Sequence, residues 1–253
     1  MALVIDKLNF YRKSHHVLRD LSFTVPYGKI VAFLGPNGAG KTTALKILIG
    51  LTPLSIEKKH LNHYIQLDNN CLCRASIHQR IESGLVYMSQ QSSLFEDLSA
   101  YENLKVIFDY HSAWQGESLQ SFEDFIDPWI EKTEIRSAMH RAARYLSGGQ
   151  KRKIELIRTL LMHPKVVLLD EPFAGVDPKS IEEIQDLLHE VAMTGVGILI
   201  SDHHVFQLLN FVDYCYLLVS GEVVSEGVAE KMMNDSKTQE VYLGKKMGYY
   251  KQT

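Results

Sequence analysis

The sequence has few of the features that stabilise proteins outside the cell or inside a bilayer. It contains three cysteines in 253 residues, and this small, odd number provides no disulfide framework and is typical of a reducing compartment. It has no run of the roughly 18 apolar residues needed to span a bilayer, and Asp6 interrupts the apolar start, so we expect neither a membrane anchor nor a signal peptide. Any membrane role is therefore expected to depend on a partner protein.

The sequence also lacks an excess of charge of one sign. Its formal net charge is −3, so no global basic field argues for nucleic acid, and we expect no nucleic-acid partner. No internal repeat and no low-complexity segment is found. The hydrophobic content of 45% and the charged content of 23% are ordinary for a soluble globular protein.

Short apolar runs alternate with helical patterns along most of the chain. Runs of branched residues predict buried strands at residues 29–35, 165–170, 196–201 and 214–220. Such runs, separated by helices, indicate a parallel sheet that is covered on both faces. The first thirty residues alternate instead between apolar and polar side chains, which predicts antiparallel strands.

Two segments do not follow this alternation. Residues 92–145 have helical spacing and predict a helical insertion with a core of Trp114, Phe122, Phe125 and Trp129. Residues 53–83 are polar and contain His60, His63, Cys71, Cys73 and His78. Because their spacing matches no usual structural zinc site, a surface hairpin or loop is the favoured interpretation.

The motif GPNGAGKT follows the first expected buried strand and matches the pattern G-x-x-x-x-G-K-[ST]. Its glycines allow successive N–H groups to turn inward around an anion, and a helix starting at Lys41 adds the positive end of its dipole. Lys41 would then reach the β- and γ-phosphates, and the Thr42 hydroxyl would bind Mg²⁺. The predicted nucleotide-binding residues of this motif are Gly35, Pro36, Asn37, Gly38, Ala39, Gly40, Lys41, Thr42 and Thr43.

A second motif, KVVLLDEP, places two carboxylates at the end of another expected buried strand. Ligands of open α/β sheets bind at the carboxyl ends of the strands. Asp170 would hold Mg²⁺, and Glu171 would accept a proton from an attacking water. Alone, the motif is equally typical of an exposed acidic turn; paired with GPNGAGKT, it predicts a nucleotide hydrolase.

A third motif, LSGGQ at residues 146–150, starts a helix with two glycines, although Gly opposes helix formation by about 1 kcal/mol per residue. The bare glycine backbone would let a γ-phosphate approach the helix N-terminus. The helix that follows is amphipathic: Ile154, Ile157, Leu160 and Leu161 share one face, and Arg152, Lys153 and Glu155 are expected to point elsewhere.

The chain resembles the nucleotide-binding subunits of ABC transporters, because GPNGAGKT, LSGGQ and LLDEP occur in the order of that family across nearly the whole chain. The resemblance implies an α/β fold: a P-loop ATPase core of the ABC type with an antiparallel β subdomain and an inserted helical subdomain. It also implies ATP and Mg²⁺ as cofactors and a head-to-tail homodimer. In that dimer each ATP lies between one chain's phosphate cradle and the partner's Leu146, Ser147, Gly148, Gly149 and Gln150.

On this basis we divide the chain into four parts. They are an N-terminal β subdomain and P-loop core (1–91), a helical subdomain (92–145), a core containing the signature, Walker B and switch motifs (146–220), and a C-terminal hairpin and tail (221–253).

The resemblance assigns further roles one residue at a time. Tyr11 lies where the family stacks an aromatic ring on adenine, and Phe10 is the alternative. Gln90 in VYMSQQ is assigned to Mg²⁺ and the attacking water, with Gln91 as the alternative. The family usually has proline where this chain has Ser89, so we expect a looser loop here.

Two more positions follow from the same resemblance. Asp177 in AGVDP is placed in the loop that crosses the dimer interface. His203 in LISDHHV is assigned as the sensor of the γ-phosphate, with His204 as the alternative.

The family docks its membrane partner in a groove between the glutamine loop and the helical insertion. In the stretch SSLFEDLSAYENL, Leu98 and Leu104 are expected to fill the helical core. Phe95 precedes a helix that starts near Ser99, where Glu102 completes an N-cap signal. We therefore predict that Phe95 is exposed and contacts the partner.

Within the family, LLDEPFAGVDP, SDHHV and the closing EVYLGKKM resemble the ATPase of the lipopolysaccharide transport complex of Gram-negative bacteria. This resemblance implies two transmembrane permease subunits as partners, membrane contact only through them, and a cytoplasmic location, peripheral on the inner membrane. The ATPases of branched-chain amino-acid importers have similar ends and are the alternative.

Two other classes fit less well. Soluble, non-transport ABC proteins usually carry two cassettes or a long coiled-coil insertion, and this chain has neither feature. A small-molecule kinase or a GTPase would leave LSGGQ and His203 without a role, and no N-K-x-D guanine-reading motif occurs.

Overall fold

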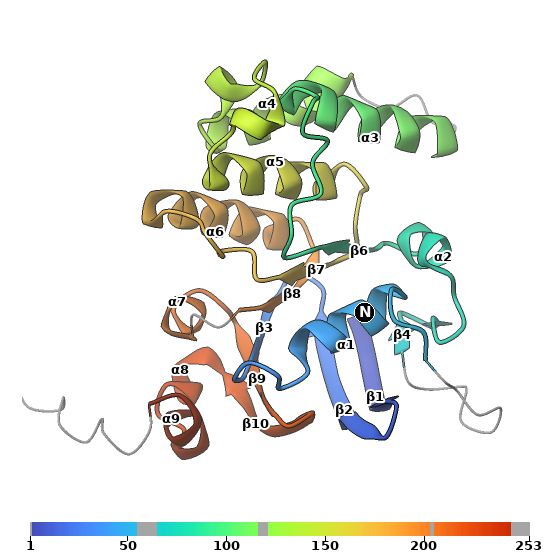
Figure 1. The fold of residues 1–253 in the computed structure, drawn as a ribbon, viewed down its shortest axis with the longest axis vertical. Coiled ribbons are helices and arrows are strands. Elements are labelled where there is room, and N and C mark those ends of the chain that lie inside the picture. Colours follow the sequence, from blue (N-terminus) through green and yellow to red (C-terminus); the bar gives the residue numbers. More distant parts are fainter. Residues whose placement is uncertain (1, 55–64, 116–120, 203–204, 244–253) are drawn as a thin grey trace, which may run out of the picture.

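The computed structural model describes residues 2–54, 65–115, 121–202 and 205–243, and these contain two sheets and a layer of helices (Figure 1). The antiparallel sheet has the order β2-β1-β4-β5. Its strands are β1 (Ala2–Arg12), β2 (His15–Pro26), β4 (Ile65–Leu67) and β5 (Asn70–Cys71).

The second sheet has the order β10-β9-β3-β8-β7-β6, and all of its neighbouring pairs are parallel except β9 with β10. Its strands are β3 (Ile30–Leu34), β6 (Leu85–Met88), β7 (Val166–Asp170), β8 (Gly197–Ser201), β9 (Tyr214–Val219) and β10 (Glu222–Val228). The expected α/β fold and the four expected buried strands are confirmed, whereas β6 was not recognised because it has only four residues and precedes a polar loop.

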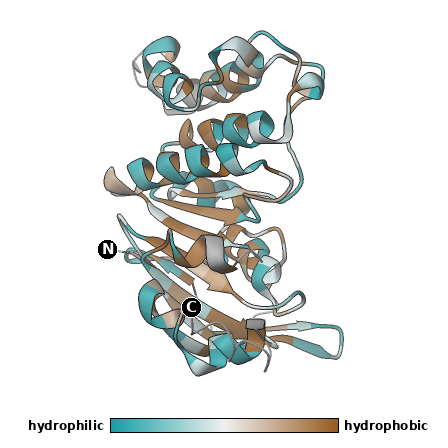
Figure 2. Cartoon of the chain, turned by 90° about the vertical axis from the view of Figure 1, so that its left-hand side faces the viewer, coloured by the Kyte–Doolittle hydropathy of each residue, from teal (hydrophilic) through white to brown (hydrophobic). Residues whose placement is uncertain are grey.

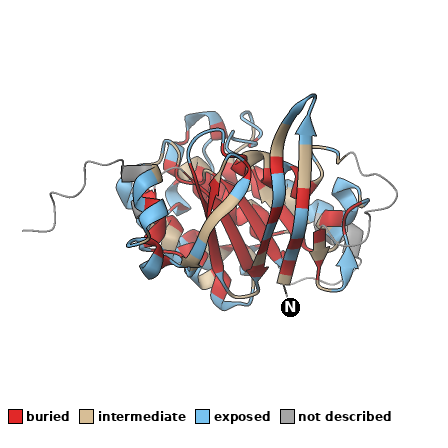
Figure 3. Ribbon diagram, turned by 90° about the horizontal axis from the view of Figure 1, so that it is seen from below, coloured by how far each residue is buried: buried red, intermediate tan, exposed pale blue. Residues whose placement is uncertain are grey.

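The parallel sheet is covered on both faces, which explains its nearly continuous apolar runs. Along β3, Ile30 and Ala32 pack on one face with α6 (Pro178–Met193), whereas Val31 and Phe33 pack on the other with α1 (Lys41–Ile49) and the antiparallel sheet. Figure 2 shows these strands as the hydrophobic centre of the molecule, and Figure 3 shows them buried at the centre, between helices with exposed outer residues and beside the β1–β2 hairpin, whose tip is exposed.

The predicted helical insertion forms a layer at the top of Figure 1, over α5 (Gly148–Leu160). It contains α3 (Ala100–Gln115), α4 (Phe122–Lys132) and the 3-10 helices Arg136–Ala138 and Ala143–Tyr145. This layer has its own apolar core, to which α5 contributes Ile154 and Ile157. Of the aromatic residues expected there, Phe122 is buried and Phe125 and Trp129 pack at the edge, while the side chain of Trp114 lies outside the described part.

The remaining helices are short, and the described part of the polar segment forms the β4–β5 hairpin and α2. Their bounds are α2 (Ile77–Glu82), α7 (Val205–Leu209), α8 (Ala229–Met232) and α9 (Ser236–Leu243). His60 and His63 lie outside the described residues, and no cluster of three or more His, Cys, Asp or Glu suited to a metal ion is found among the residues described. In the described ranges, no helix is long and apolar enough to cross a membrane.

Candidate functional site

The phosphate cradle is the loop between β3 and the N-terminus of α1. Gly38 and Gly40 have φ values of +82° and +105°, which residues other than glycine rarely adopt. A Cβ on Gly35 would overlap the carbonyl oxygen of Leu218, so the loop also needs glycine for space. No side chain caps α1 at Gly40. The N–H groups of its first turn are therefore not bonded to a capping side chain and can donate to a bound anion.

Lys41 is the only lysine side chain of this cradle, and it is buried (6% exposed). Its Nζ donates hydrogen bonds to the carbonyl oxygens of Gly35 at 2.5 Å and Pro36 at 3.2 Å, within the loop itself. Burial lowers the pKa of Lys41, although the carboxylates of Glu171 and Asp170 act in the opposite direction. The amine is thus held where a phosphate oxygen would replace the loop carbonyls as its acceptor.

Asp170 ends β7 and accepts hydrogen bonds from hydroxyls on three other elements. Its Oδ1 accepts from Thr42 at 2.9 Å and from Ser201 at 2.6 Å, and its Oδ2 accepts from Tyr87 at 3.2 Å. Burial, followed by the charge of Asp170, raises the pKa of Tyr87, which keeps its hydroxyl protonated as a donor. The carboxylate is therefore fixed beside Thr42, and the pair supplies the oxygen ligands that Mg²⁺ prefers.

Glu171 lies directly after Asp170 in a strained conformation. Its φ is +48°, an uncommon value for a residue with a side chain, and its N–H donates to the carbonyl of Ser201 at 2.7 Å. Gln90, two residues after β6, donates from Nε2 to Glu171 Oε2 at 2.7 Å. Residues held in such sparsely populated conformations cluster at functional sites, and here the strain coincides with the carboxylate expected to be the base.

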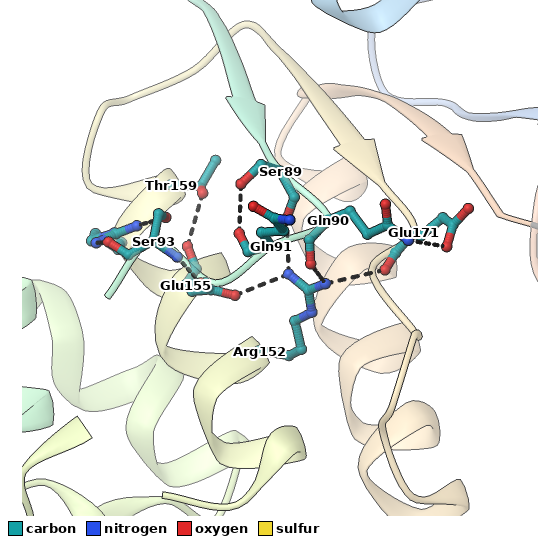
Figure 4. Close-up of polar contacts among 9 residues, drawn as sticks. Ser89, Gln90, Gln91, Ser93, Arg152, Glu155, Thr159 and Glu171 are labelled. Carbon is teal, nitrogen blue, oxygen red and sulfur yellow. Dashed lines mark hydrogen bonds and ion pairs between the residues drawn. The ribbon is translucent and has the colours of Figure 1, made fainter. Parts of the chain in front are cut away.

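A buried arginine on α5 ties these two segments together (Figure 4). Arg152 donates to the carbonyl oxygens of Ser89 at 2.9 Å, of Gln90, and of Glu171 at 3.4 Å, and it pairs with Glu155 at 3.0 Å. Arg152, Lys153 and Glu155 belong to none of the apolar clusters, but they are buried, at 6%, 6% and 1% exposed, which the sequence did not predict. Their partners are backbone groups of segments distant in the sequence, a charge within α5 and a charge on α6, and helical periodicity does not reveal such partners.

The same contacts hold the glutamine loop (residues 89–93), which was expected to be loose because Ser89 replaces proline. The Ser89 hydroxyl donates to the carbonyl of Gln91 at 2.6 Å, and the N–H of Ser93 donates to Glu155 at 2.7 Å. The loop is therefore tied to α5 at both ends. Gln90, rather than its neighbour Gln91, is the glutamine that contacts Glu171.

The LSGGQ motif forms the start of α5 as predicted. Ser147 is its N-cap, and a capping box joins the Ser147 hydroxyl to the N–H of Gln150 at 3.2 Å and the Gln150 side chain to the N–H of Ser147 at 3.0 Å. Ser147 and Gly148 are exposed, whereas Gly149 is buried against the start of α6. Asp177, the N-cap of α6, is exposed and accepts from the N–H of Ser180 at 3.0 Å.

Tyr11 and Phe10 differ in exposure at the end of β1. Tyr11 is 58% exposed and its ring stacks on His16, with centroids 4.0 Å apart, whereas Phe10 packs against the core. His16 is fixed by Asn9, whose Oδ1 lies 2.9 Å from its Nε2. The exposed ring of Tyr11, supported by His16, is better placed to stack on adenine than the ring of Phe10, which packs against the core.

Phe95 is exposed, as predicted, on a rigid backbone. Its ring is 52% exposed, while its N–H and carbonyl are bonded to the buried Asn103 side chain at 2.8 and 3.0 Å. Neighbouring Leu94 points into the helical core instead. His203 and His204 both lie outside the described residues.

Comparison with known proteins identifies the class. The ABC transporter family model matches residues 18–174. The lipopolysaccharide export system ATP-binding protein LptB of Haemophilus influenzae is 36% identical over 242 residues, covering 96% of this chain and 97% of that protein. The chain therefore belongs to the ABC transporter family, and it is an ATP-hydrolysing subunit of that family.

Solved structures agree with this fold. A nucleotide-free ATP-binding cassette from an ABC transporter superposes with a TM-score of 0.80 at 24% identity, covering 96% of this chain and 99% of that chain. A dimeric cassette in a post-hydrolysis state, bound to ADP and phosphate, superposes with a TM-score of 0.75 at 20% identity, covering 90% and 98%.

Proposed function

We propose that this chain is the ATPase of a lipopolysaccharide exporter and that it works as a head-to-tail homodimer which closes on ATP. The observation that carries the ATPase chemistry is the meeting of three motifs at one sheet edge, where Thr42 lies 2.9 Å from Asp170 and Gln90 lies 2.7 Å from Glu171. The similarity to LptB over 96% of the chain supports the cargo.

In this proposal the cradle binds the triphosphate. The N–H groups of residues 35–43 surround the phosphates, Lys41 exchanges its loop carbonyls for β- and γ-phosphate oxygens, and Tyr11 stacks on adenine. Thr42, Asp170 and Gln90 would hold Mg²⁺, which neutralises phosphate oxygens when bound.

Glu171 acts as the general base for the attacking water. Gln90 orients its carboxylate through the 2.7 Å hydrogen bond, and the Ser201 carbonyl holds its backbone. His203, which follows β8 in the sequence, would sense the γ-phosphate, as the family resemblance implies. Phosphoryl transfer needs mainly such positioning and charge stabilisation.

Closure of two chains completes each site with the partner's residues 146–150, and Asp177 lies at the interface. The exposure of Ser147, Gly148 and Asp177 supports this role, because a partner reaches them without unfolding either chain. The similarity in fold to a dimeric cassette that holds ADP and phosphate is consistent with it. Shifting such an equilibrium from 1:99 to 99:1 requires about 5.5 kcal/mol of differential ATP affinity.

The test of the chemistry is Glu171→Gln, which preserves shape and removes the base. We expect ATP binding to persist, hydrolysis to fall by about 10²-fold or more, and gel filtration with ATP and Mg²⁺ to show a stable dimer. Glu182→Gln on the exposed face of α6 is the matched control and should hydrolyse normally. Near-normal hydrolysis by Glu171→Gln would refute the assignment.

We propose Phe95 as the contact with two transmembrane permease subunits, through which the chain would lie on the cytoplasmic face of the inner membrane. Phe95→Ala should keep basal ATP hydrolysis and the thermal midpoint, yet lose the permeases that copurify with the wild-type chain. Interface aromatics are typically worth about 2 kcal/mol or more, roughly thirtyfold in affinity. Met193→Ala, which removes an equally apolar and 87% exposed side chain elsewhere, is the control.

The cargo is tested separately. Depletion of the chain in its own bacterium should remove lipopolysaccharide from the cell surface while leaving uptake of branched-chain amino acids unchanged. Loss of that uptake with normal surface lipopolysaccharide would replace the proposed cargo by the importer alternative.

A further inference from the structure

The paired glycines of LSGGQ cannot be explained by backbone conformation. Gly148 and Gly149 both lie in the first turn of α5, and neither has a positive φ. Alanine adopts this conformation readily and is the better helix former by about 1 kcal/mol. The requirement for glycine must therefore come from what surrounds the two Cα atoms.

The surroundings are supplied by the same chain. A Cβ on Gly148 would lie 2.6 Å from the carbonyl oxygen of Gly175. A Cβ on Gly149 would lie 2.7 Å from Ser180 Cβ, overlap its hydroxyl, and lie 3.1 Å from Asp177 Oδ2. Gly149 and Ser180 are both buried in the single chain, before any partner is added. The start of α5 thus packs directly on the segment that leads into α6.

This contact continues one turn further along both helices. Lys153, four residues after Gly149, forms an ion pair with Glu183 on α6 and donates to the carbonyl of Thr133 at 3.0 Å. The side chains of Lys153 and Glu183 are 7% and 16% exposed. Close packing and a largely buried ion pair together fix the register of α5 against α6.

We infer that the two signature glycines serve a contact within the chain, which joins LSGGQ and the dimer loop (residues 174–178) into one rigid element. Ser180 is a positioning residue of this element, because its side chain fills the space that Gly149 leaves. The functional consequence of this inference rests on the proposed dimer. In that dimer, LSGGQ and the dimer loop would contact the partner chain at a fixed distance from each other. The packing itself is independent of any dimer.

The test is a pair of substitutions that exchange volume across the contact. Gly149→Ala should lower the thermal midpoint of the nucleotide-free chain by roughly 3–8 °C, although helix propensity alone predicts an increase. Ser180→Gly should restore the midpoint of Gly149→Ala to that of Ser180→Gly alone, whereas Ser180→Ala should restore little, because its Cβ remains. Gly227→Ala is the matched control, since Gly227 also has negative φ and its Cβ would meet nothing closer than 3.7 Å.

The functional readout separates positioning from stability. Gly149→Ala should lower kcat by about tenfold or more and reduce ATP cooperativity, with the ATP affinity of the isolated chain unchanged, and Ser180→Gly should recover both kcat and cooperativity. A raised midpoint in Gly149→Ala, or a double variant that stays unstable, would overturn the packing claim. Recovery of stability without recovery of turnover would overturn the positioning role. A wild-type chain that hydrolyses ATP without dimerising would instead contradict the proposed function. The thermal midpoints of Gly149→Ala and of the double variant would still decide whether the packing claim is correct.

Discussion

Replacing Arg152 by methionine should lower the free energy of unfolding more than any surface substitution, because Arg152 and Glu155 are a buried ion pair. Their side chains are 8% and 1% exposed and lie 3.0 Å apart. Arg152→Met keeps the length of the side chain and removes its charge, so that the carboxylate of Glu155 stays buried with the N–H of Ser93 and the charge of Arg158 near it. Breaking a buried pair from one side costs about 3–5 kcal/mol, against a total stability of about 5–15 kcal/mol for a typical domain.

Urea unfolding of the nucleotide-free chain measures this cost. We expect the midpoint to fall with little change in slope, since the exposed surface on unfolding stays the same. Arg152→Met combined with Glu155→Gln should recover part of the loss, because the amide oxygen still accepts from Ser93 and carries no charge. A loss below about 1 kcal/mol in Arg152→Met, typical of an exposed pair, would refute the assignment of a buried clamp.

The same variant has a functional consequence. The guanidinium donates to the carbonyls of Ser89, Gln90 and Glu171, so its loss frees the glutamine loop and the candidate base together. We expect kcat to fall further than ATP affinity, and amide hydrogen exchange of residues 89–93 to accelerate. Unchanged exchange in this loop would show that other contacts position Gln90.

Three further outcomes follow from exposure and charge. Lys41→Met should weaken ATP binding by about tenfold or more, the worth of a charged hydrogen bond; because burial lowers the pKa of Lys41, it should leave the nucleotide-free chain as stable as before or more so by thermal unfolding. Tyr11→Ala should weaken binding of ATP but not of inorganic tripolyphosphate in a competition assay, since the ring is proposed to stack on adenine and not to contact the phosphates. Iodoacetamide at pH 8 should label exposed Cys71 in the folded chain and spare Cys215, whose pKa burial raises to about 12; labelling of Cys215 before unfolding, seen by mass spectrometry, would contradict its burial.

The sequence predicted the parts of the site that lie at strand ends. GPNGAGKT follows β3 and Asp170 ends β7, so the direction of these two predicted strands brings Lys41 and Asp170 to one edge of the sheet. Gln90 was assigned by the family resemblance, and it reaches the same edge because it follows β6, a strand that was not recognised from the sequence. The hydroxyls around Asp170 were not predicted. Tyr87 and Ser201 occupy strand positions whose side chains show no signal beyond ordinary strand composition, and only the register of β6, β7 and β8 places them beside the carboxylate.

The burial of the charges on α5 was not predicted, and the physical reason also bears on how the helical layer can move. The helical layer has its own apolar core, distinct from the two cores that flank the parallel sheet. Its junction with the rest of the chain includes directional polar contacts: Arg152 to the glutamine loop, Lys153 to Glu183, and Lys132 to Glu190. A helix periodicity rule assigns such charges to solvent because it considers one helix and one core, whereas α5 lies between two.

A polar junction between two parts of a chain resists relative motion less than a continuous apolar core does. Apolar packing interdigitates and resists sliding, whereas interfaces between domains are more polar and relative motion across them is the default expectation. The contacts at Gly149 and Lys153 would then be the exceptions that keep α5 in register with α6. Because α3 and α4 share an apolar core with α5, they are expected to move together with it, and the contacts at Gly149 and Lys153 would keep the signature and the dimer loop together during such a motion.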